Sequence, residues 1–280
     1  MIKTIAVVGA GTMGSGIAQV AAQSGHSTIL FDLNKAILEK AAINIKKSLQ
    51  YLTNKKSISA EQEEQIFKNI LFTSNINDCI ADLIIEAIVE NAPAKIELFN
   101  TLSTFNSTTT IFATNTSSLS ITQIQAGIIC PERVVGMHFF NPAPAMKLVE
   151  IIKGHQTNAA TLQAIAALCN NMNKVPVICK DSPGFIVNRI ARQYYLEAMQ
   201  LVEEGIATFE NIDTVMEATG FKMGPFKLMD LIGLDINLAV SKSIYEAFNF
   251  EVRFLPAAFQ IDKVNKGQLG RKAGKGFYQY

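Results

Sequence analysis

The chain has 280 residues, of which 49% are hydrophobic and 18% are charged. This composition supplies a sizeable core and excludes a disordered protein, and the length fits one large α/β unit or two domains. Twenty-five Lys and Arg residues stand against twenty-four Asp and Glu residues, which leaves a formal net charge of +1. No overall basic field attracts nucleic acid, so we expect no nucleic-acid partner, although a local basic patch stays open.

The cysteines lie far apart in the sequence, at Cys79, Cys130, Cys169 and Cys179. No pair has metal-ligand spacing, so we expect no disulfide scaffold and no metal, and we predict a cytoplasmic location. The uncharged run 4–25 superficially resembles a secretory signal, but four glycines interrupt its apolar residues. No other stretch approaches the roughly 18 apolar residues of a membrane span, so no membrane partner is expected.

Short apolar runs alternate with helical patterns over the first half, which is typical of βαβ units around a parallel sheet. The first predicted elements are a buried strand, a helix and a second strand, at 2–9, 14–23 and 27–32. Asn34 is placed to cap the long helix that follows. Ser59 and Gln62 form a capping box for a polar helix, which we expect to pair with the long one as a helical hairpin.

The later strands of this half are predicted at 83–87, 110–114, 134–139, 148–152 and 175–179, with helices at 93–102 and 158–171. The turn cluster Asp181–Gly184 marks a domain boundary, which we place after Pro183. Beyond it the predicted helices are 189–204, 212–218, 228–232, 236–248 and 256–264, with one strand at Gly276–Tyr278. The sequence thus predicts an α/β nucleotide-type domain over 1–183 and a helical domain over 184–280.

Gly9, Gly11 and Gly14 match the pattern G-x-G-x-x-G between a predicted strand and a predicted helix. The first glycine permits a tight turn, the second lets backbone approach a pyrophosphate, and the third lets helix pack on strand. The helix N-terminus then offers N–H groups and a positive dipole end to the phosphates. Asp32 ends the next strand, where it suits ribose hydroxyls and repels a 2′-phosphate, which favours NAD. Lys35 nearby leaves some use of NADP open.

His138 is the histidine whose surroundings suit acid–base chemistry. It ends a predicted strand, two prolines follow, and the chain then enters the strand that carries Glu150. Removing a proton from a hydroxyl group needs a base that titrates near neutral pH, which is the property of histidine. If the two strands pair as a hairpin, Glu150 meets the other ring nitrogen and fixes the tautomer. From spacing alone, a satisfied half-buried histidine and a rim carboxylate are an equally open interpretation.

Two more polar residues are candidates for the same site. Ser117 lies in the loop 115–118 after a predicted strand, at the sheet edge where open α/β sheets bind ligands. Asn188 lies one helical turn after Gly184, where it can present an amide to a cleft. Each has a structural alternative, which is a helix-capping loop for Ser117 and an ordinary first-turn residue for Asn188.

Taken together, these motifs resemble the L-3-hydroxyacyl-CoA dehydrogenase family, particularly its short bacterial 3-hydroxybutyryl-CoA dehydrogenases. The segments that carry the resemblance are 7–14, 115–118, 138–142, 181–189, 223–230 and 274–278. It implies a Rossmann domain with a helical-hairpin insertion, followed by an all-helical domain that binds substrate and forms a homodimer. It also implies NAD-dependent, reversible oxidation of a (3S)-3-hydroxyacyl-CoA, such as 3-hydroxybutyryl-CoA, to the 3-oxoacyl-CoA, as in fatty acid β-oxidation or butanoate metabolism.

Carried over residue by residue, the resemblance implies that His138 is the catalytic acid/base and that Glu150 orients it. Ser117 and Asn188 would hold the reacting oxygen and the histidine. The positions implied to bind NAD are Gly9, Ala10, Gly11, Thr12, Met13, Gly14, Asp32, Glu90, Lys95, Ser117, Asn141 and Lys272. Those implied to contact coenzyme A are Ser48, Lys55 and Ser117. The hairpin segment 51–69 is least typical of the family, and Lys55 equally suits a solvated helix end.

Two functional alternatives stay open on the sequence. A longer-chain or 3-hydroxyadipyl-CoA substrate would use the same catalytic residues, and pocket residues of the helical domain would decide between them. A non-catalytic dinucleotide-binding protein would keep the fold, because fold does not imply function. Such a protein has no need of His138 and Glu150 together with Ser117 and Asn188.

Overall fold

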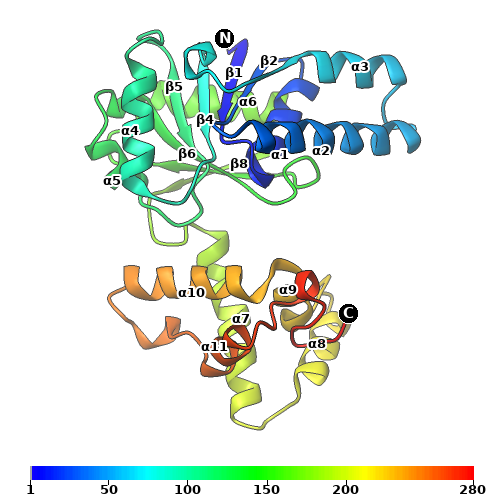
Figure 1. Ribbon diagram of the computed structural model, residues 1–280. Coiled ribbons are helices and arrows are strands. Elements are labelled where there is room, and N and C mark those ends of the chain that lie inside the picture. The colour runs from blue at the N-terminus through cyan, green and yellow to red at the C-terminus, as the bar shows by residue number, and fades with distance from the viewer. Residues whose placement is uncertain (1) are drawn as a thin grey trace. The chain divides into compact units, whose positions relative to one another are not determined.

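The computed structural model describes residues 2–280, which form two compact units. The first unit ends at Ser182, and the second comprises Pro183–Tyr280. The first contains one eight-stranded sheet with helices on both faces, and the second is built from helices (Figure 1). Within residues 2–280, none of the helices combines the length and apolar character that crossing a bilayer requires.

The strands of the sheet are β1 (Thr4–Val8), β2 (Ser27–Phe31), β3 (Ile70–Thr73), β4 (Leu83–Glu86), β5 (Ile111–Thr114), β6 (Val134–Phe139), β7 (Leu148–Lys153) and β8 (Val175–Lys180). Their order is β3-β2-β1-β4-β5-β6-β7-β8. Neighbouring strands are parallel, apart from the antiparallel pair β6 and β7. The inner strands read as continuous apolar runs because helices cover both of their faces.

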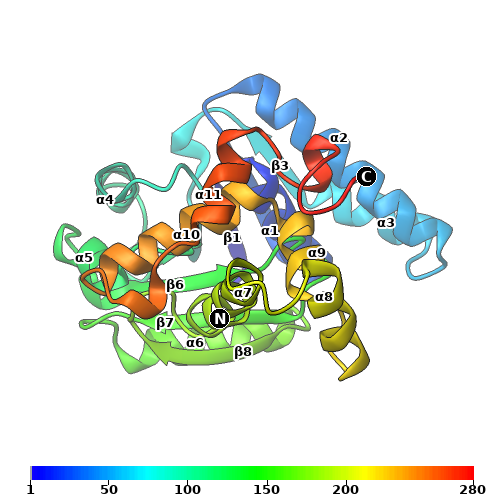
Figure 2. The same ribbon diagram turned by 90° about the horizontal axis from the view of Figure 1, so that it is seen from below.

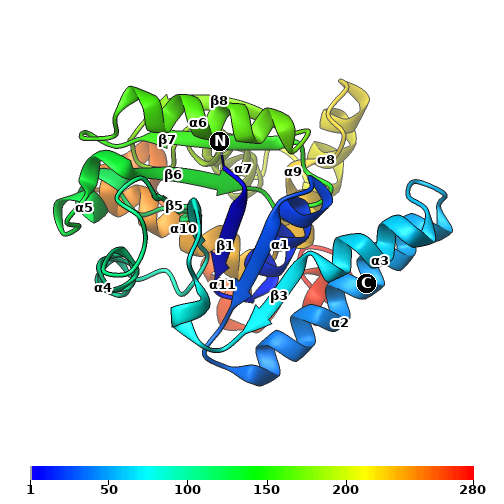
Figure 3. The same cartoon turned by 90° about the horizontal axis from the view of Figure 1, so that it is seen from above.

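The helices of this unit are α1 (Thr12–Gln23), α2 (Lys35–Asn54), α3 (Ala60–Lys68), α4 (Ala92–Ser103), α5 (Ile121–Ala126) and α6 (Ala159–Asn171). On one face, Ile17 of α1 and Leu49 of α2 belong to the same buried cluster as Val7 of β1. On the other face, Phe99 of α4 packs edge-on against Phe112 of β5, with ring centroids 5.4 Å apart. Figure 3 shows α1 and α4 on opposite sides of β1.

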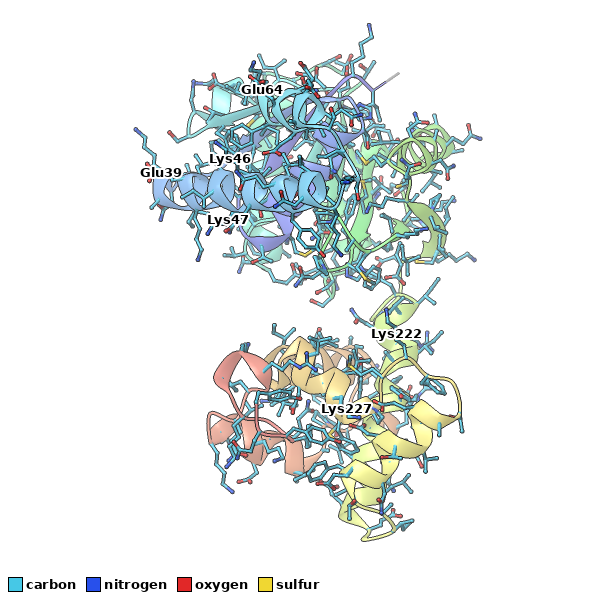
Figure 4. The ribbon with its side chains drawn as sticks, turned by 90° about the vertical axis from the view of Figure 1, so that its right-hand side faces the viewer. Glu39, Lys46, Lys47, Glu64, Lys222 and Lys227 are labelled. Carbon is cyan, nitrogen blue, oxygen red and sulfur yellow. The ribbon has the colours of Figure 1, made fainter. Side chains whose placement is uncertain are left out.

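The predicted helical hairpin is confirmed, because α2 and α3 run alongside each other (Figure 1). Asn34 caps α2 by accepting a hydrogen bond from the Ala36 N–H, and Ser59 and Gln62 form the predicted capping box of α3. The outer face of the hairpin is charged, as Figure 4 shows for Lys46 and Lys47.

The second unit contains α7 (Val187–Glu203), α8 (Phe209–Ala218), α9 (Pro225–Ile232), α10 (Leu234–Ala247) and α11 (Ala258–Asn265). Met199 of α7, Phe226 and Met229 of α9 and Phe277 belong to its apolar core. Figure 2 looks along α7, with α8, α9 and α10 beside it. Each of these helices overlaps a predicted one, so the helical character of this region is confirmed.

The strand predicted at Gly276–Tyr278 is wrong. The part of the chain that the structure describes has only isolated bridges there, which pair Gly270 with Lys275 and Lys275 with Gln279. The main-chain N–H groups of Phe277 and Tyr278 instead donate to the buried carboxylate of Asp230, each at 2.9 Å. A side chain thus satisfies the backbone groups that a neighbouring strand would otherwise pair.

The short strand β3 and the short α-helix α5 were not predicted. β3 contains four residues, of which only Ile70 and Thr73 are buried, and it lies at the edge of the sheet beside β2. α5 contains six residues, from Ile121 to Ala126, and begins at the cap Ser120. Neither segment is long enough to establish a hydrophobic period in the sequence.

Candidate active site

The site forms where the strands of the first unit end. β1, β2, β4, β5 and β6 are parallel, so their carboxyl ends lie at one edge of the sheet. The residues at these ends include Gly9, Asp32, Glu86, Asn115 and His138. In open α/β sheets this edge is where ligands bind, so the topology brings these candidates together.

The three glycines of the turn after β1 have different surroundings. Gly9 has a φ of +100°, and a Cβ there would lie 2.5 Å from the carbonyl oxygen of Ala87. A Cβ on Gly14 would collide with the carbonyl oxygen of Gly9, whereas a Cβ on Gly11 would have no atom within 4 Å. The open space at Gly11 adjoins the N-terminus of α1, which has no side-chain cap. The space at Gly11 fits a pyrophosphate, because no side chain fills it and the backbone N–H groups at the N-terminus of α1 are available as donors.

Asp32 is tied to the glycine turn. Its Oδ2 accepts a 2.9 Å hydrogen bond from the Ala10 N–H, and its Oδ1 accepts one of the same length from the Asn34 N–H. Each carboxylate oxygen can accept more than one hydrogen bond, so capacity for ribose hydroxyls remains. The turn and the acidic residue after the second strand therefore form one unit that fits a dinucleotide.

Lys95 and Glu86 form a buried ion pair below the loop that follows β4. The Lys95 ammonium on α4 is 1% exposed and lies 2.6 Å from Oε1 of the fully buried Glu86. Glu86 also accepts from the hydroxyl group of Thr114 at 2.6 Å and from the Ile88 N–H at 2.7 Å. These hydrogen bonds occupy the other lone pairs of the carboxylate, and a buried ion pair is tolerated in low-dielectric surroundings when its remaining polar atoms are paired in this way. Sequence reasoning missed Glu86, although an acid at the end of an apolar strand was a signal for it.

Glu90 joins this pair to the loop after β5. It lies 3.2 Å from the Lys95 ammonium and accepts hydrogen bonds from the Ser117 N–H and the Ser118 hydroxyl, at 3.1 and 3.0 Å. Burial acts to raise the pKa of Glu90, but the Lys95 charge and the hydrogen bonds, including one from Thr116, outweigh it and lower the pKa. Glu90, Lys95 and Ser117 are thus brought together through an ionised carboxylate.

His138 and Glu150 lie directly opposite each other on β6 and β7. The predicted hairpin pairing is therefore confirmed. Both side chains are buried, and Nδ1 of His138 lies 2.8 Å from Oε2 of Glu150. With Glu150 ionised, the carboxylate can only accept, and the matching tautomer has its proton on Nδ1 and a basic Nε2. The arrangement can accept a proton at Nε2 and balance the resulting charge without water.

The ends of β5 and β6 are also joined to each other. The side-chain carbonyl of Asn115 accepts a 2.8 Å hydrogen bond from the Phe139 N–H, next to His138. The Phe140 ring packs against the imidazole, with centroids 4.5 Å apart. Asn141 follows in the exposed start of the loop between β6 and β7. The histidine is thus held from its strand partner, from the β5 loop and from an aromatic neighbour.

The other predicted site residues lie at the start of α1, on or next to α2, or in the second unit. Ser48 lies on α2, and Lys55 follows the last residue of that helix as its C-cap. Lys55 is exposed, and its ammonium lies 4.8 Å from the Tyr51 ring centroid. Thr12 and Met13 begin α1, next to the glycine turn. Asn188 lies in the first turn of α7, and Lys272 is exposed and pairs with Asp235 at 2.6 Å.

A sheet of this topology with a dinucleotide turn after its first strand is the architecture of NAD-dependent dehydrogenases. Residues 4–182 match the family described as 3-hydroxyacyl-CoA dehydrogenase, NAD binding domain, and residues 184–280 match its C-terminal domain. The chain therefore belongs to the 3-hydroxyacyl-CoA dehydrogenase family and is an NAD-dependent oxidoreductase. The predicted family, fold class and cofactor are confirmed.

The chain is 44% identical over its whole length to 3-hydroxyadipyl-CoA dehydrogenase of Escherichia coli (strain K12), but it spans only 59% of that relative. It is 41% identical to 3-hydroxybutyryl-CoA dehydrogenase of Clostridioides difficile, with 99% of each chain covered. Among solved structures, (S)-3-hydroxybutyryl-CoA dehydrogenase from Ralstonia eutropha superposes with a TM-score of 0.95 at 38% identity. That alignment covers 100% of this chain and 99% of the other.

Proposed function

We propose that this protein catalyses the reversible oxidation of a (3S)-3-hydroxyacyl-CoA to the 3-oxoacyl-CoA, with NAD as the oxidant. The observation that carries this proposal is the buried pair of His138 and Glu150 at the same sheet edge as the dinucleotide turn. The substrate loses a hydride from C3 and a proton from its hydroxyl group. NAD, when bound, takes up the hydride.

In this proposal, Nε2 of His138 takes the hydroxyl proton in the oxidation and returns it in the reduction. Glu150 stabilises the imidazolium that forms, because the two charges lie 2.8 Å apart and are shielded from solvent. The glutamate also fixes the ring, so the base keeps one orientation throughout the reaction. Near neutral pH, histidine is suited to both directions of transfer.

The remaining roles are part of the same proposal. Ser117 and Asn188 hold the reacting oxygen and the histidine, and Ser48, Lys55 and Ser117 contact coenzyme A. The NAD site consists of the turn Gly9–Gly14 with Asp32, Glu90, Lys95, Ser117, Asn141 and Lys272. Residues 1–183 bind the cofactor, while 184–280 form a substrate domain through which two copies of the chain associate.

Two acyl groups are candidates for the substrate. The four-carbon 3-hydroxybutyryl-CoA is the simpler proposal, because a relative of matching length carries that name at 41% identity. The six-carbon dicarboxylic 3-hydroxyadipyl-CoA is the second, and it is favoured by the relative named for it at 44% identity. Both candidates require the same chemistry at C3.

The test is the oxidation of NADH in the presence of acetoacetyl-CoA, followed by the loss of NADH absorbance. Parallel reactions contain NADPH in place of NADH, and free acetoacetate in place of the thioester. We expect fast turnover only with NADH and the thioester, because Asp32 repels a 2′-phosphate and the free acid lacks the CoA contacts. NADH binding without turnover of any 3-oxoacyl-CoA would instead support a non-catalytic dinucleotide-binding protein.

A further inference from the structure

Arg192, in α7 of the second unit, is a buried cation that has no acidic partner among residues 2–280. Its side chain is 3% exposed. Nη1 donates to the main-chain oxygen of Asn237 at 2.8 Å, to Oδ1 of the same residue at 3.1 Å, and to the Ser241 hydroxyl at 2.6 Å. All of these acceptors are neutral, and within residues 2–280 Arg192 forms no ion pair.

Such a charge is costly unless something compensates it. Burial lowers the pKa of Arg192 to about 10, so the guanidinium is still charged at neutral pH. In the part of the chain that the structure describes, three buried polar atoms of Arg192 and its neighbours have no hydrogen-bond partner, namely Nε of Arg192, Nδ2 of Asn237 and Oε1 of Gln260. Two of the three are donors, and one of these belongs to the cation. The Tyr195 ring, whose centroid lies 4.9 Å from the guanidinium carbon, offsets part of the charge. The two unpaired donors still call for an acceptor, and an anionic one would also supply a counter-charge.

The side chains of Arg192 and Gln260 both donate a hydrogen bond to the same atom of Asn237. Oδ1 of Asn237 accepts from Nη1 of Arg192 and, at 2.9 Å, from Nε2 of Gln260. This shared acceptor fixes the Asn237 amide with its Nδ2 group turned away from both donors. Arg192 of α7, Asn237 of α10 and Gln260 of α11 thus form a cluster that is held together by these hydrogen bonds.

Arg192 also has a defined position relative to Asn188, to which the proposed function gives a place at the reacting oxygen. Residues four apart lie on the same face of a helix, so Arg192 follows Asn188 one turn further along α7. One turn advances about 5.4 Å. The helix positions of Asn188 and Arg192 are therefore separated by about the length of a few carbon–carbon bonds.

We propose that Arg192 and Asn237 bind a carboxylate at the far end of the acyl chain, so that the preferred substrate is a dicarboxylic 3-hydroxyacyl-CoA with about six acyl carbons. This inference rests on the proposed function and selects between its two substrates. The free N–H of the guanidinium and the Asn237 amide donate to the carboxylate oxygens, and the guanidinium supplies the counter-charge. A water molecule between the carboxylate and Gln260 meets the remaining acceptor.

The experiment compares two thioesters of equal length that differ only in their end group. These are 3-oxoadipyl-CoA, which ends in a carboxylate, and 3-oxohexanoyl-CoA, which ends in a methyl group. We expect the wild-type kcat/KM with NADH to favour 3-oxoadipyl-CoA by about 10-fold or more, because a hydrogen bond to a charged group contributes about that factor. In Arg192→Met this ratio falls by about 10- to 100-fold.

Arg253→Met is the matched control. Arg253 is an exposed arginine of the same unit, paired with Glu251, and its removal leaves the ratio at the wild-type value. Arg192→Lys keeps the charge without the planar fork and loses only part of the preference. The wild-type ratio needs no variant, so the inference is testable even if Arg192→Met does not fold.

Each alternative outcome has its own meaning. A wild-type ratio near one, with normal turnover of acetoacetyl-CoA, overturns the inference and leaves the proposed function intact. It would indicate that the cluster encloses only water or meets a second copy of the chain. A high ratio of the two kcat/KM values that Arg192→Met does not change means that another residue binds the carboxylate. This outcome overturns the assignment to Arg192. No turnover of any thioester overturns the proposed function and the inference together.

Discussion

Lys174 and Ala143 are joined by a 2.6 Å hydrogen bond from a buried ammonium group to a main-chain carbonyl. The same ammonium donates to the carbonyl of Met146 at 2.8 Å. Both carbonyls belong to the loop between β6 and β7, which separates His138 from Glu150. Burial lowers the pKa of Lys174 despite an opposing effect of Cys169. The loop beside the His138–Glu150 pair is therefore held by a desolvated lysine.

We expect Lys174→Met to destabilise the protein and to slow catalysis. Two buried carbonyls lose their donor, which costs about 2 kcal/mol of unfolding free energy. The loop also gains freedom, so kcat with acetoacetyl-CoA falls more than the affinity for NADH. Urea unfolding and steady-state kinetics measure the two effects. The exposed Lys153 at the end of β7 provides the control Lys153→Met, and an unchanged kcat in Lys174→Met would restrict Lys174 to a stabilising role.

Substitutions at the histidine–glutamate pair should separate catalysis from cofactor binding. We expect His138→Gln to lower kcat by about 10³-fold and Glu150→Gln by about 10²- to 10⁴-fold, because the first removes the proposed base and the second its proposed orientation and counter-charge. The dissociation constant of NADH, measured by fluorescence titration, should stay within about threefold of the wild-type value. Near-wild-type turnover by His138→Gln would remove this residue from the mechanism.

The glycine turn offers a matched pair of substitutions with opposite expectations. Gly11→Ala adds a Cβ with no atom within 4 Å, so the free protein should keep its unfolding free energy while NADH affinity falls. Gly14→Ala drives a Cβ into the carbonyl of Gly9, and such overpacking costs about 1–3 kcal/mol or more. Thermal unfolding without cofactor and NADH titration measure both effects. Equal NADH affinity in Gly11→Ala and the wild type would argue against pyrophosphate binding at this turn.

Glu90 gives a pH-dependent prediction. The pKa of Glu90 is lowered in the folded protein from the ordinary 4.5, so its ionised form stabilises the fold. This stabilisation is complete above pH 4.5, and it is lost as the pH falls through the lower pKa of the folded protein. Solvent screening limits the effect to roughly 1 kcal/mol. We therefore expect Glu90→Gln to be less stable than the wild type at neutral pH, with a gap that closes in acid. Glu39→Gln, at an exposed position on α2 (Figure 4), should show no such gap, and a constant gap for Glu90→Gln would contradict this account.

Much of the first unit could be predicted because its signals are local. The glycine spacing, the caps at Asn34 and Ser59 and the apolar strand runs each depend on a few neighbouring residues. The pairing of His138 with Glu150 required one further step, the assumption of a hairpin between their strands. That assumption succeeded because the strands are adjacent in the chain, and adjacent strands commonly pair.

The features that escaped prediction depend on contacts between distant residues. The segment Gly276–Tyr278 has the composition of a strand, yet Asp230 far earlier in the chain takes up its N–H groups. Glu86 lies at the end of a run that has the pattern of an ordinary buried strand, and its partner Lys95 comes from a helix that follows later in the chain. Arg192 likewise looks like a surface residue of an amphipathic helix until α10 is packed against it.

The antiparallel ladder between β6 and β7 has a consequence for how this enzyme can vary. Strand register, and not the length of the intervening loop, places His138 opposite Glu150, and a slip by one residue would turn one side chain to the other face. Lys174 holds that loop through main-chain carbonyls, which any amino acid supplies. Apart from Asn141, the loop sequence can therefore diverge, or be redesigned for other substrates, while the pairing of His138 with Glu150 is kept.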